Sequence, residues 1–394
     1  MARSGTAPLK APDCYGVSLV PETIAFIDLQ AQRHRLGAPL EAAIKAAVEG
    51  GQWILGPQVG QLERDLAAWA GVKHAIACAN GTDALLLVLK AWGVGPGDAV
   101  FVPAFTFAAS GEVVVLAGAT PVFVDVLPDT FNMDPASLET AIALVKRDGK
   151  LTPKVVMPVD LFGQPADYRA LQPIAAREGL KVFCDTAQGF GGALDGKRTG
   201  AIGDAAATSF FPAKPLGCYG DGGACFTNDD ALKDVLLSLR MHGQGSDRYE
   251  HVRIGFNSRL DTIQAAILIE KLKIFGEEIE LRNKVARRYS DVFRKSNRLV
   301  VPHVIEGAVS SWAQYTLQVE NRVKFQADLK AKGVPTAVYY PIPLSRQRAY
   351  GHFPSAPTPV SEALAEKVIS LPMHPYLDEP TQDRVIAAVL ESAG

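Results

Sequence analysis

The sequence predicts an α/β fold, with a mainly parallel sheet in a large domain and a smaller C-terminal α+β domain. From about residue 52, short runs of β-branched and aromatic residues alternate with longer helix-forming segments. The short runs are apolar throughout, which is typical of strands buried on both faces. After about Leu272 a charged segment leads into a smaller mixed region. The alternation of strand-like and helix-like segments favours a parallel sheet covered by helices, and the change of pattern after Leu272 favours a second domain.

Seven apolar runs are expected to form strands. They lie at residues 74–80, 99–105, 120–126, 154–163, 181–187, 207–211 and 223–228. Residues 81–93 and 167–179 have apolar residues at helical spacing and a terminal glycine, which predicts helices between strands. Residues 275–296 form the charged segment and are also expected to be helical. The expected division is an arm over residues 1–25, a large domain over 26–272 and a small domain over 273–394.

Composition and charge narrow the possible partners. The 394 residues are 48% hydrophobic and 21% charged, in the ordinary range for soluble globular proteins. With a formal charge of −2, the chain has no overall positive charge that would attract nucleic acid or an anionic membrane. No stretch approaches the roughly 18 uninterrupted apolar residues of a membrane span. We therefore expect a cytoplasmic protein with no nucleic-acid or membrane partner and no metal.

The spacing of the cysteines and the composition of the N-terminal residues both favour a protein of a reducing compartment. The five cysteines form no CxxC pair, and three of them lie in runs expected to be strands. Free, buried thiols are the expected state. The first twenty residues are rich in small residues and proline and lack the apolar core of a secretory signal, so we interpret them as a loosely ordered arm.

Lys214 has an unusual setting. The stretch "SFFPAKPLGCYGDGG" (209–223) places it between two prolines, after an aromatic run and before several glycines. Apolar surroundings would lower the pKa of its amine and favour the neutral form that attacks a carbonyl. The alternative is a surface lysine whose stem lies along apolar neighbours.

Polar residues follow several of the expected strands, where α/β sheets commonly bind ligands. "CANGTDALLL" puts Asn80, Gly81 and Thr82 at a strand–helix junction, with Asp83 in the first turn. Backbone N–H groups at such a helix start suit a phosphate, although Gly and Thr there can simply cap the helix. Asp185 directly follows another apolar run and is likewise either catalytic or a helix cap.

Together these features fit pyridoxal 5′-phosphate. That cofactor needs a lysine amine to form an imine, a carboxylate beside its pyridine nitrogen, an aromatic ring against its face and donors for its phosphate. Lys214, Asp185, the aromatic run "PAFTF" and the junction at Gly81 each meet one of these needs.

The chain resembles the DegT/DnrJ/EryC1/StrS sugar aminotransferases. The resemblance runs from "FIDLQAQ" at Phe26 to "LPMHPYL" ending at Leu377. It includes the ordered motifs "WILGPQVGQLE", "ANGTDAL", "PAFTFAAS", "DTAQGFGG", "SFFPAKPLGCYGDGGACFTND", "GFNSRLDTIQAAI" and "YYPIPL". It implies a type I fold, as in aspartate aminotransferase, with pyridoxal phosphate as cofactor.

The resemblance also implies residue roles. Lys214 would form the Schiff base and Asp185 would pair with the pyridinium nitrogen. The other cofactor-binding residues would be Gln188 at the ring hydroxyl, Phe107 over the ring, Gly81, Thr82 and Ser209 at the phosphate, and Asn257 reaching the phosphate in the neighbouring subunit. A homodimer with shared sites is implied. Dehydratases of the family have histidine at the Schiff-base position, so Lys214 favours transamination.

The implied reaction moves an amino group from L-glutamate to a nucleotide-linked keto sugar, with Lys214 moving the proton. The sequences of several motifs are most similar to those of the family branch that acts on UDP-2-acetamido-2-deoxy-3-oxo-glucuronate. That branch serves bacterial surface polysaccharide (O-antigen) synthesis. Expected substrate-binding residues are His242, Arg259 and Tyr340.

The basic segment 240–259 could receive a diphosphate or a carboxylate, or could be a solvated loop with structural ion pairs. Arg259 could accordingly bind the uronate carboxylate or pair with Asp261. The alternatives for function are amination of a 3-keto or 4-keto deoxysugar on dTDP or GDP, and a pyridoxal phosphate-binding regulatory protein. The complete set of cofactor residues argues against the regulatory alternative.

Overall fold

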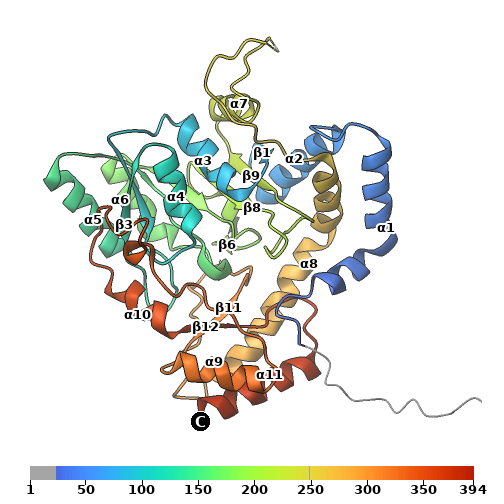
Figure 1. Ribbon diagram of the computed structural model, residues 1–394, viewed down its shortest axis with the longest axis vertical. Helices are drawn as coiled ribbons and strands as arrows, with labels where there is room; N and C mark the ends of the chain where they lie inside the picture. The colour runs from blue at the N-terminus through green and yellow to red at the C-terminus, as the bar shows by residue number, and fades with distance from the viewer. Residues whose placement is uncertain (1–23, 248) are drawn as a thin grey trace, which may run out of the picture.

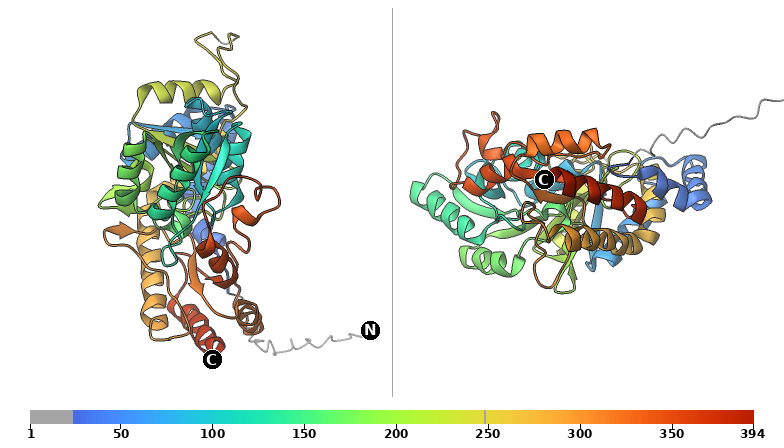
Figure 2. Two further views of the ribbon diagram at one scale, coloured as in Figure 1. Left: turned by 90° about the vertical axis from the view of Figure 1, so that its left-hand side faces the viewer. Right: turned by 90° about the horizontal axis from the view of Figure 1, so that it is seen from below.

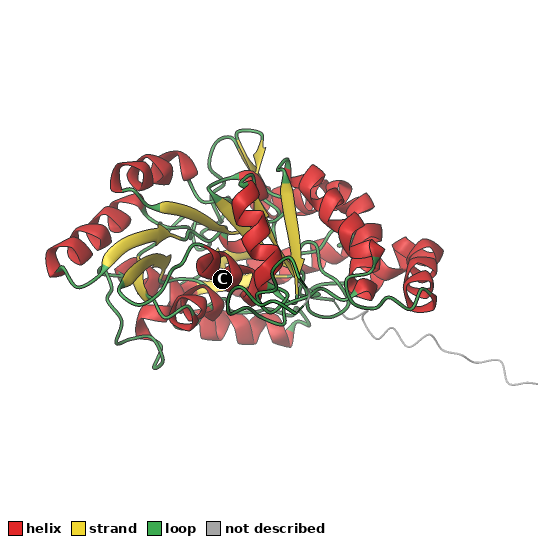
Figure 3. Cartoon of the chain, turned by 90° about the horizontal axis from the view of Figure 1, so that it is seen from above, coloured by secondary structure: helices red, strands yellow, loops and turns green. Residues whose placement is uncertain are grey.

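A seven-stranded sheet forms the centre of the molecule (Figures 1 and 3). The computed structural model describes residues 24–247 and 249–394. The strands of this sheet are β1 (His74–Cys78), β2 (Asp98–Pro103), β3 (Thr120–Val124), β4 (Thr152–Val156), β5 (Lys181–Asp185), β8 (Ala205–Ser209) and β9 (Gly223–Thr227). Their order is β1-β9-β8-β5-β4-β2-β3, and only β9 runs antiparallel to its neighbours. Each predicted run overlaps one of these strands, so the mainly parallel sheet is confirmed.

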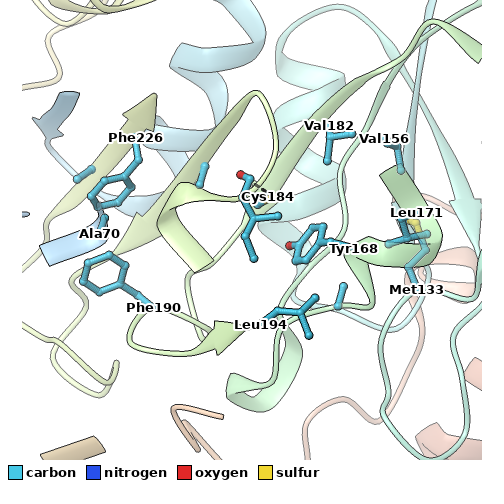
Figure 4. Packing of buried hydrophobic residues seen from close by; sticks show 14 of the residues in the cluster. Ala70, Met133, Val156, Tyr168, Leu171, Val182, Cys184, Phe190, Leu194 and Phe226 are labelled. Atoms are coloured by element: carbon cyan, nitrogen blue, oxygen red, sulfur yellow. Dashed lines mark hydrogen bonds between the residues drawn. The ribbon is translucent and has the colours of Figure 1, made fainter. Parts of the chain in front are cut away.

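Both faces of the sheet are buried, as the continuous apolar runs predict. In β2, Ala99 and Phe101 belong to one hydrophobic cluster, while Val100 and Val102 belong to another on the opposite face. This division follows from the alternating direction of side chains along a strand. Figure 4 shows part of the first cluster, in which Tyr168 lies beside Cys184 and Leu194.

Helices cover the sheet on its two sides (Figures 1 and 2). The apolar stretch of α3 (Gly81–Ala91) is buried from Ala84 to Leu89, so α3 packs as an internal helix. Gly179 ends α6 (Tyr168–Glu178) in the left-handed conformation, as its position predicted. The remaining helices of this part are α1 (Leu29–Glu49), α2 (Pro57–Ala70), α4 (Ala108–Leu116), α5 (Pro135–Asp148) and α7 (Asp230–Leu239).

The long helix α8 (Thr262–Phe293) connects the two halves of the chain. The domain boundary expected near Leu272 falls inside this helix. Ala265, Leu268, Phe275 and Ile279 of α8 pack in the core of the large sheet, whereas the buried apolar residues from Val285 to Phe293 pack in a separate C-terminal core. That second core contains β11 (Tyr315–Gln318), β12 (Val368–Leu371), α9 (Arg322–Ala331) and α11 (Glu379–Ala393).

The remaining elements are short. They are α10 (Pro359–Lys367), the three-stranded sheet of β6 (Ala193–Leu194), β7 (Lys197–Arg198) and β10 (Ala308–Val309), and the 3-10 turns η1 (Leu161–Gly163), η2 (Thr199–Ala201) and η3 (Leu344–Arg346). After α7, residues 241–247 and 249–257 form a hairpin joined by bridges at Met241–Asn257 and Gln244–His251. It projects beyond α7 at the top of Figure 1.

Four cysteines in the described chain are free and buried, as expected; they are Cys78, Cys184, Cys218 and Cys225. Cys14 and most of the expected N-terminal arm lie outside the described residues, as does Arg248 of the basic segment. Ile24, near the end of that arm, is buried against the C-terminal core. None of the helices within residues 24–247 and 249–394 has both the length and the apolar character needed to cross a bilayer.

Candidate active site

Lys214 lies in a closed loop between β8 and β9. The Phe210 N–H donates to the Gly222 carbonyl, and the Cys218 N–H donates to the Phe210 carbonyl, both at 2.7 Å. The Lys214 N–H itself donates to the Phe211 carbonyl at 2.8 Å. Burial lowers the pKa of the Lys214 amine, while the nearby Asp185 carboxylate acts in the opposite direction. The loop therefore presents an amine that loses its proton more easily than an exposed lysine does.

Asp185 ends β5, beside β8, and its carboxylate is buried. One carboxylate oxygen accepts from the Ser110 hydroxyl at 2.9 Å, and the other accepts from the Ala187 N–H at 3.1 Å. Burial raises the pKa of Asp185, while these two donors and Lys214 lower it. Each oxygen keeps a free lone pair, so the carboxylate can accept a further hydrogen bond.

Gln188 links the large sheet to the C-terminal part of the chain. Its amide nitrogen donates to the Tyr340 hydroxyl at 3.1 Å, and its oxygen accepts from the Phe162 N–H at 2.6 Å. The Tyr340 ring lies 6.1 Å from the ring of Phe107, centroid to centroid. Phe107 is 56% exposed although it lies just before α4, a few residues after the buried strand β2. Its open face is available to a flat ligand.

The start of α3 meets the end of β8. Asn80 caps the helix by accepting the Asp83 N–H at 2.8 Å. A side chain at Gly81 would place its Cβ 2.5 Å from the Cβ of Ser209, so only glycine allows this close approach. The first N–H groups of a helix have no partner within it, and they favour a negative charge. Gly81, Thr82 and Ser209 thus form a small cradle suited to a phosphate.

The other predicted residues, His242, Asn257 and Arg259, lie on or beside the hairpin. The His242 N–H donates to the Phe256 carbonyl at 2.9 Å. Arg259 donates from Nη2 to the side-chain oxygen of Asn257. The hairpin base is tied to the cradle, because Ser258 Oγ accepts from the Ala79 N–H at 3.3 Å.

Arg240, also in the basic segment, has a structural role. Its guanidinium is buried, donates to the Ala77 carbonyl at 2.7 Å and pairs with Glu63. For this residue the alternative of a structural ion pair is correct.

Three residues near Asp185 were not predicted. Thr106 Oγ1 lies 3.1 Å from Ser110 Oγ, which in turn donates to Asp185. Both hydroxyls belong to the motif "PAFTFAAS", from which only Phe107 had been assigned. Asp160 is also fully buried, and its N–H donates to the Asp185 carbonyl at 3.0 Å. Burial raises the pKa of Asp160 to about 7.

These groups fit pyridoxal phosphate by their chemistry. One region of the molecule contains an amine with a lowered pKa and a carboxylate that can accept a further hydrogen bond. It also contains an amide paired with a phenol, an exposed aromatic face and a phosphate cradle. The Gly81 position supports the fit independently, because any larger residue would clash with Ser209 and force the helix start away from the end of β8.

The family model described as "DegT/DnrJ/EryC1/StrS aminotransferase family" matches residues 35–390. The chain belongs to this family. It is 50% identical over 368 residues to the UDP-2-acetamido-2-deoxy-3-oxo-D-glucuronate aminotransferase of Pseudomonas aeruginosa, covering 93% of this chain and 99% of that protein. It is 39% identical to the UDP-N-acetyl-3-dehydro-alpha-D-glucosamine 3-aminotransferase of Acidithiobacillus ferrooxidans, covering 93% and 97%.

Solved structures agree with this assignment. An aminotransferase of the family from Brucella abortus superposes with a TM-score of 0.92 at 52% identity, covering 94% of this chain and all of that one. NtdA from Bacillus subtilis, solved with bound PMP, superposes with a TM-score of 0.84 at 27% identity, covering 94% and 85%. The predicted family, fold, cofactor and reaction class are therefore confirmed for this aminotransferase. The roles of individual site residues stay predictions.

Proposed function

We propose that this aminotransferase transfers the amino group of L-glutamate to UDP-2-acetamido-2-deoxy-3-oxo-glucuronate and forms the 3-amino sugar. The observation that carries the proposal is the juxtaposition of Asp185, at the end of β5, and Lys214, in the loop that follows the adjacent strand β8. An amine with a lowered pKa next to a buried carboxylate is the pair that pyridoxal phosphate requires. The 50% identity to the P. aeruginosa enzyme supports this particular sugar.

Four groups would hold the cofactor. Asp185 would accept from the ring nitrogen, with Ser110 and Ala187 fixing its carboxylate. Gln188 would bond the ring hydroxyl and Phe107 would cover one face of the ring. The cradle of Gly81, Thr82 and Ser209 would bind the phosphate. Each role uses an acceptor, donor or surface that the geometry leaves accessible.

Bound pyridoxal phosphate supplies an electron sink that makes the C–H bond next to the substrate nitrogen acidic. Lys214 would accept that proton from the substrate carbon and return it to the C4′ carbon of the cofactor, because a neutral amine serves as a base and the resulting ammonium serves as an acid. Burial favours the neutral form that this role needs. Tyr340 would keep its proton, since burial raises the pKa of its hydroxyl well above the usual value.

Arg259 is the proposed partner of the uronate carboxylate. A guanidinium can donate two parallel hydrogen bonds to a carboxylate. The competing role is structural, and the contact with Asn257 supports it because that contact occupies one of the donors. No ion pair with Asp261 appears among the salt bridges of the described residues. If Arg259 is structural, a neutral 3-keto sugar such as that named for the A. ferrooxidans relative becomes the second candidate.

The proposal includes a homodimer in which Asn257 reaches the cofactor phosphate of the neighbouring subunit, and a cytoplasmic role in surface polysaccharide synthesis. The hairpin supports the first part, because it projects away from its own α/β core and carries the exposed apolar residues Tyr249, Val252 and Ile254. Large exposed apolar side chains in one segment are typical of an interaction surface.

A substrate panel tests this function. Purified protein would be given glutamate and pyridoxal phosphate with the 3-oxo-uronate, the matching neutral 3-keto sugar and a dTDP-linked 4-keto deoxysugar. We expect the highest kcat/KM for the uronate, with one 2-oxoglutarate formed per amino sugar. A preference for either other sugar would contradict the proposed substrate, and no turnover with any would contradict the class.

A further inference from the structure

A buried lysine on α8 contacts the loop that carries Lys214. Lys271 is only 1% exposed, and its Nζ donates to the Gly217 carbonyl at 2.6 Å. The same ammonium lies 4.4 Å from the centroid of the Tyr219 ring. Lysine is almost never buried without partners, because removing its charge from water is costly. Here its partners are the backbone and ring of residues just after Lys214.

Gln264, seven residues earlier on α8, also forms hydrogen bonds to the loop that follows Lys214. Its side-chain oxygen accepts from the Tyr219 N–H at 2.8 Å, and its nitrogen faces the Tyr219 carbonyl at 3.3 Å. Residues seven apart lie on one face of a helix. One face of α8 therefore holds both ends of the short segment 217–219.

Gly217 connects these α8 contacts to the backbone near Lys214. A Cβ at Gly217 would lie 2.4 Å from the Pro212 carbonyl oxygen and 2.7 Å from that of Phe211, so the two sides of the loop are packed backbone against backbone. The Phe211 carbonyl accepts the Lys214 N–H at 2.8 Å. A shift of Gly217 would consequently move the backbone that sets the direction of Lys214.

We propose that Lys271, with Gln264, is a positioning residue that fixes the loop of the Schiff-base lysine Lys214 from α8. An apolar side chain of similar size would fill the same space without a buried charge, and such replacements are often neutral or stabilising. A lysine here is explained by the directed hydrogen bond to Gly217. This inference rests on the proposed role of Lys214.

The charges around Lys271 are few. Glu278 lies two turns further along α8, and Cys218 lies in the loop; both favour the ammonium form, while burial lowers the pKa of Lys271 to about 8. Glu278 is itself buried, where it accepts from Gln32 and Tyr376. The contact to Gly217 is thus the direct hydrogen bond of the Lys271 side chain to the loop.

The test separates covalent capture of pyridoxal phosphate from binding of pyridoxamine phosphate, which needs no bond to Lys214. Lys271→Met, Lys271→Arg and Gln264→Leu would be compared with Lys273→Met, an exposed position on the same helix. Capture is measured by borohydride reduction and peptide mass spectrometry at Lys214. We expect Lys271→Met to slow capture roughly 10- to 100-fold, with partial recovery in Lys271→Arg and unchanged pyridoxamine phosphate affinity.

Hydrogen exchange of the cofactor-free protein gives a second measurement. Peptides covering residues 210–222 should exchange faster in Lys271→Met and Gln264→Leu than in Lys273→Met. Wild-type capture rates in Lys271→Met, or an equal loss of pyridoxamine phosphate affinity, would overturn the inference. If Lys271→Met does not fold, normal capture and exchange in Gln264→Leu would overturn it. Wild-type protein without capture at Lys214 would instead contradict the proposed function, and the exchange comparison would still test the contact.

Discussion

Arg259 donates a hydrogen bond to the side-chain oxygen of Asn257 within one chain. The two residues have different proposed partners, a substrate carboxylate for Arg259 and the neighbouring subunit's cofactor phosphate for Asn257. Their contact aligns both side chains at the base of the hairpin, where Ser258 is bonded to Ala79 beside the phosphate cradle. The proposal can therefore be tested at each residue separately.

Replacing Arg259 by lysine keeps the charge and removes the paired donors. Loss of a charge-assisted hydrogen bond should cost about 1.5 to 3 kcal/mol, or roughly ten- to a hundred-fold in kcat/KM for the 3-oxo-uronate. The matching neutral sugar serves as the control substrate and should lose much less. Equal losses on both sugars would assign Arg259 to the structure of the turn.

Mixed dimers test whether Asn257 acts on the neighbouring subunit. Lys214→Ala and Asn257→Ala subunits are each expected to be impaired alone. A hybrid dimer would contain one intact site, with about half the activity of the wild-type dimer. Activity of separately purified hybrids would be measured with the uronate. Hybrids no more active than their parents would place Asn257 in its own subunit's site.

Ser110→Ala tests the support of Asp185. Removing the hydroxyl takes away a hydrogen bond that favours the ionised carboxylate, so the pKa of Asp185 should rise further. The acid limb of the pH profile for the glutamate half-reaction should then move to higher pH. Ser110→Thr keeps a hydroxyl and is the control. An unmoved acid limb in Ser110→Ala would show that Ser110 does not tune this carboxylate.

Much of the fold follows directly from local patterns. The apolar runs identify the seven strands because both faces of the sheet are covered. Their direction is not encoded in such a pattern, so the antiparallel course of β9 could not be predicted. No local pattern predicts the burial of the charged residues Lys271, Glu278 and Arg282. They are buried because polar partners from α1, the Lys214 loop and the C-terminal part contact them.

The candidate site also has residues that local sequence suggests and residues that only contacts in the folded protein bring to the site. Lys214 and Asp185 could be proposed as site residues from the sequence because their sequence neighbours already make an unusual setting for a charge. Ser110 acts through a contact 75 residues away along the chain, so its role emerges only in the folded protein. Asp160 gave no signal for a similar reason, since its burial depends on Tyr168 and Ala166 folding over it.

Asp160 predicts a pH dependence of stability. Its pKa is raised by burial from 3.8 to about 7, so its contribution is present below about pH 4 and is lost as the pH rises through 7. Asp160→Asn keeps an oxygen for the Ala166 N–H and the Tyr168 hydroxyl but cannot ionise. Relative to this variant, wild type should lose on the order of 4 kcal/mol between pH 4 and 8.

Urea unfolding of cofactor-free protein across this pH range measures that difference. Asp234→Asn, at an exposed position, should run parallel to wild type and serves as the control. A constant difference between wild type and Asp160→Asn across the range would contradict a raised pKa at Asp160.

The most direct test of the central claim follows the amino nitrogen. Wild-type protein, pyridoxal phosphate, ¹⁵N-labelled L-glutamate and UDP-2-acetamido-2-deoxy-3-oxo-glucuronate are incubated, and the sugar is analysed by mass spectrometry. Lys214→Ala, which should still bind pyridoxamine phosphate, is run in parallel. We predict a ¹⁵N-labelled 3-amino-uronate from wild type and none above background from Lys214→Ala. Unlabelled sugar from active, cofactor-loaded wild type, or substantial label transfer by Lys214→Ala, would contradict the account.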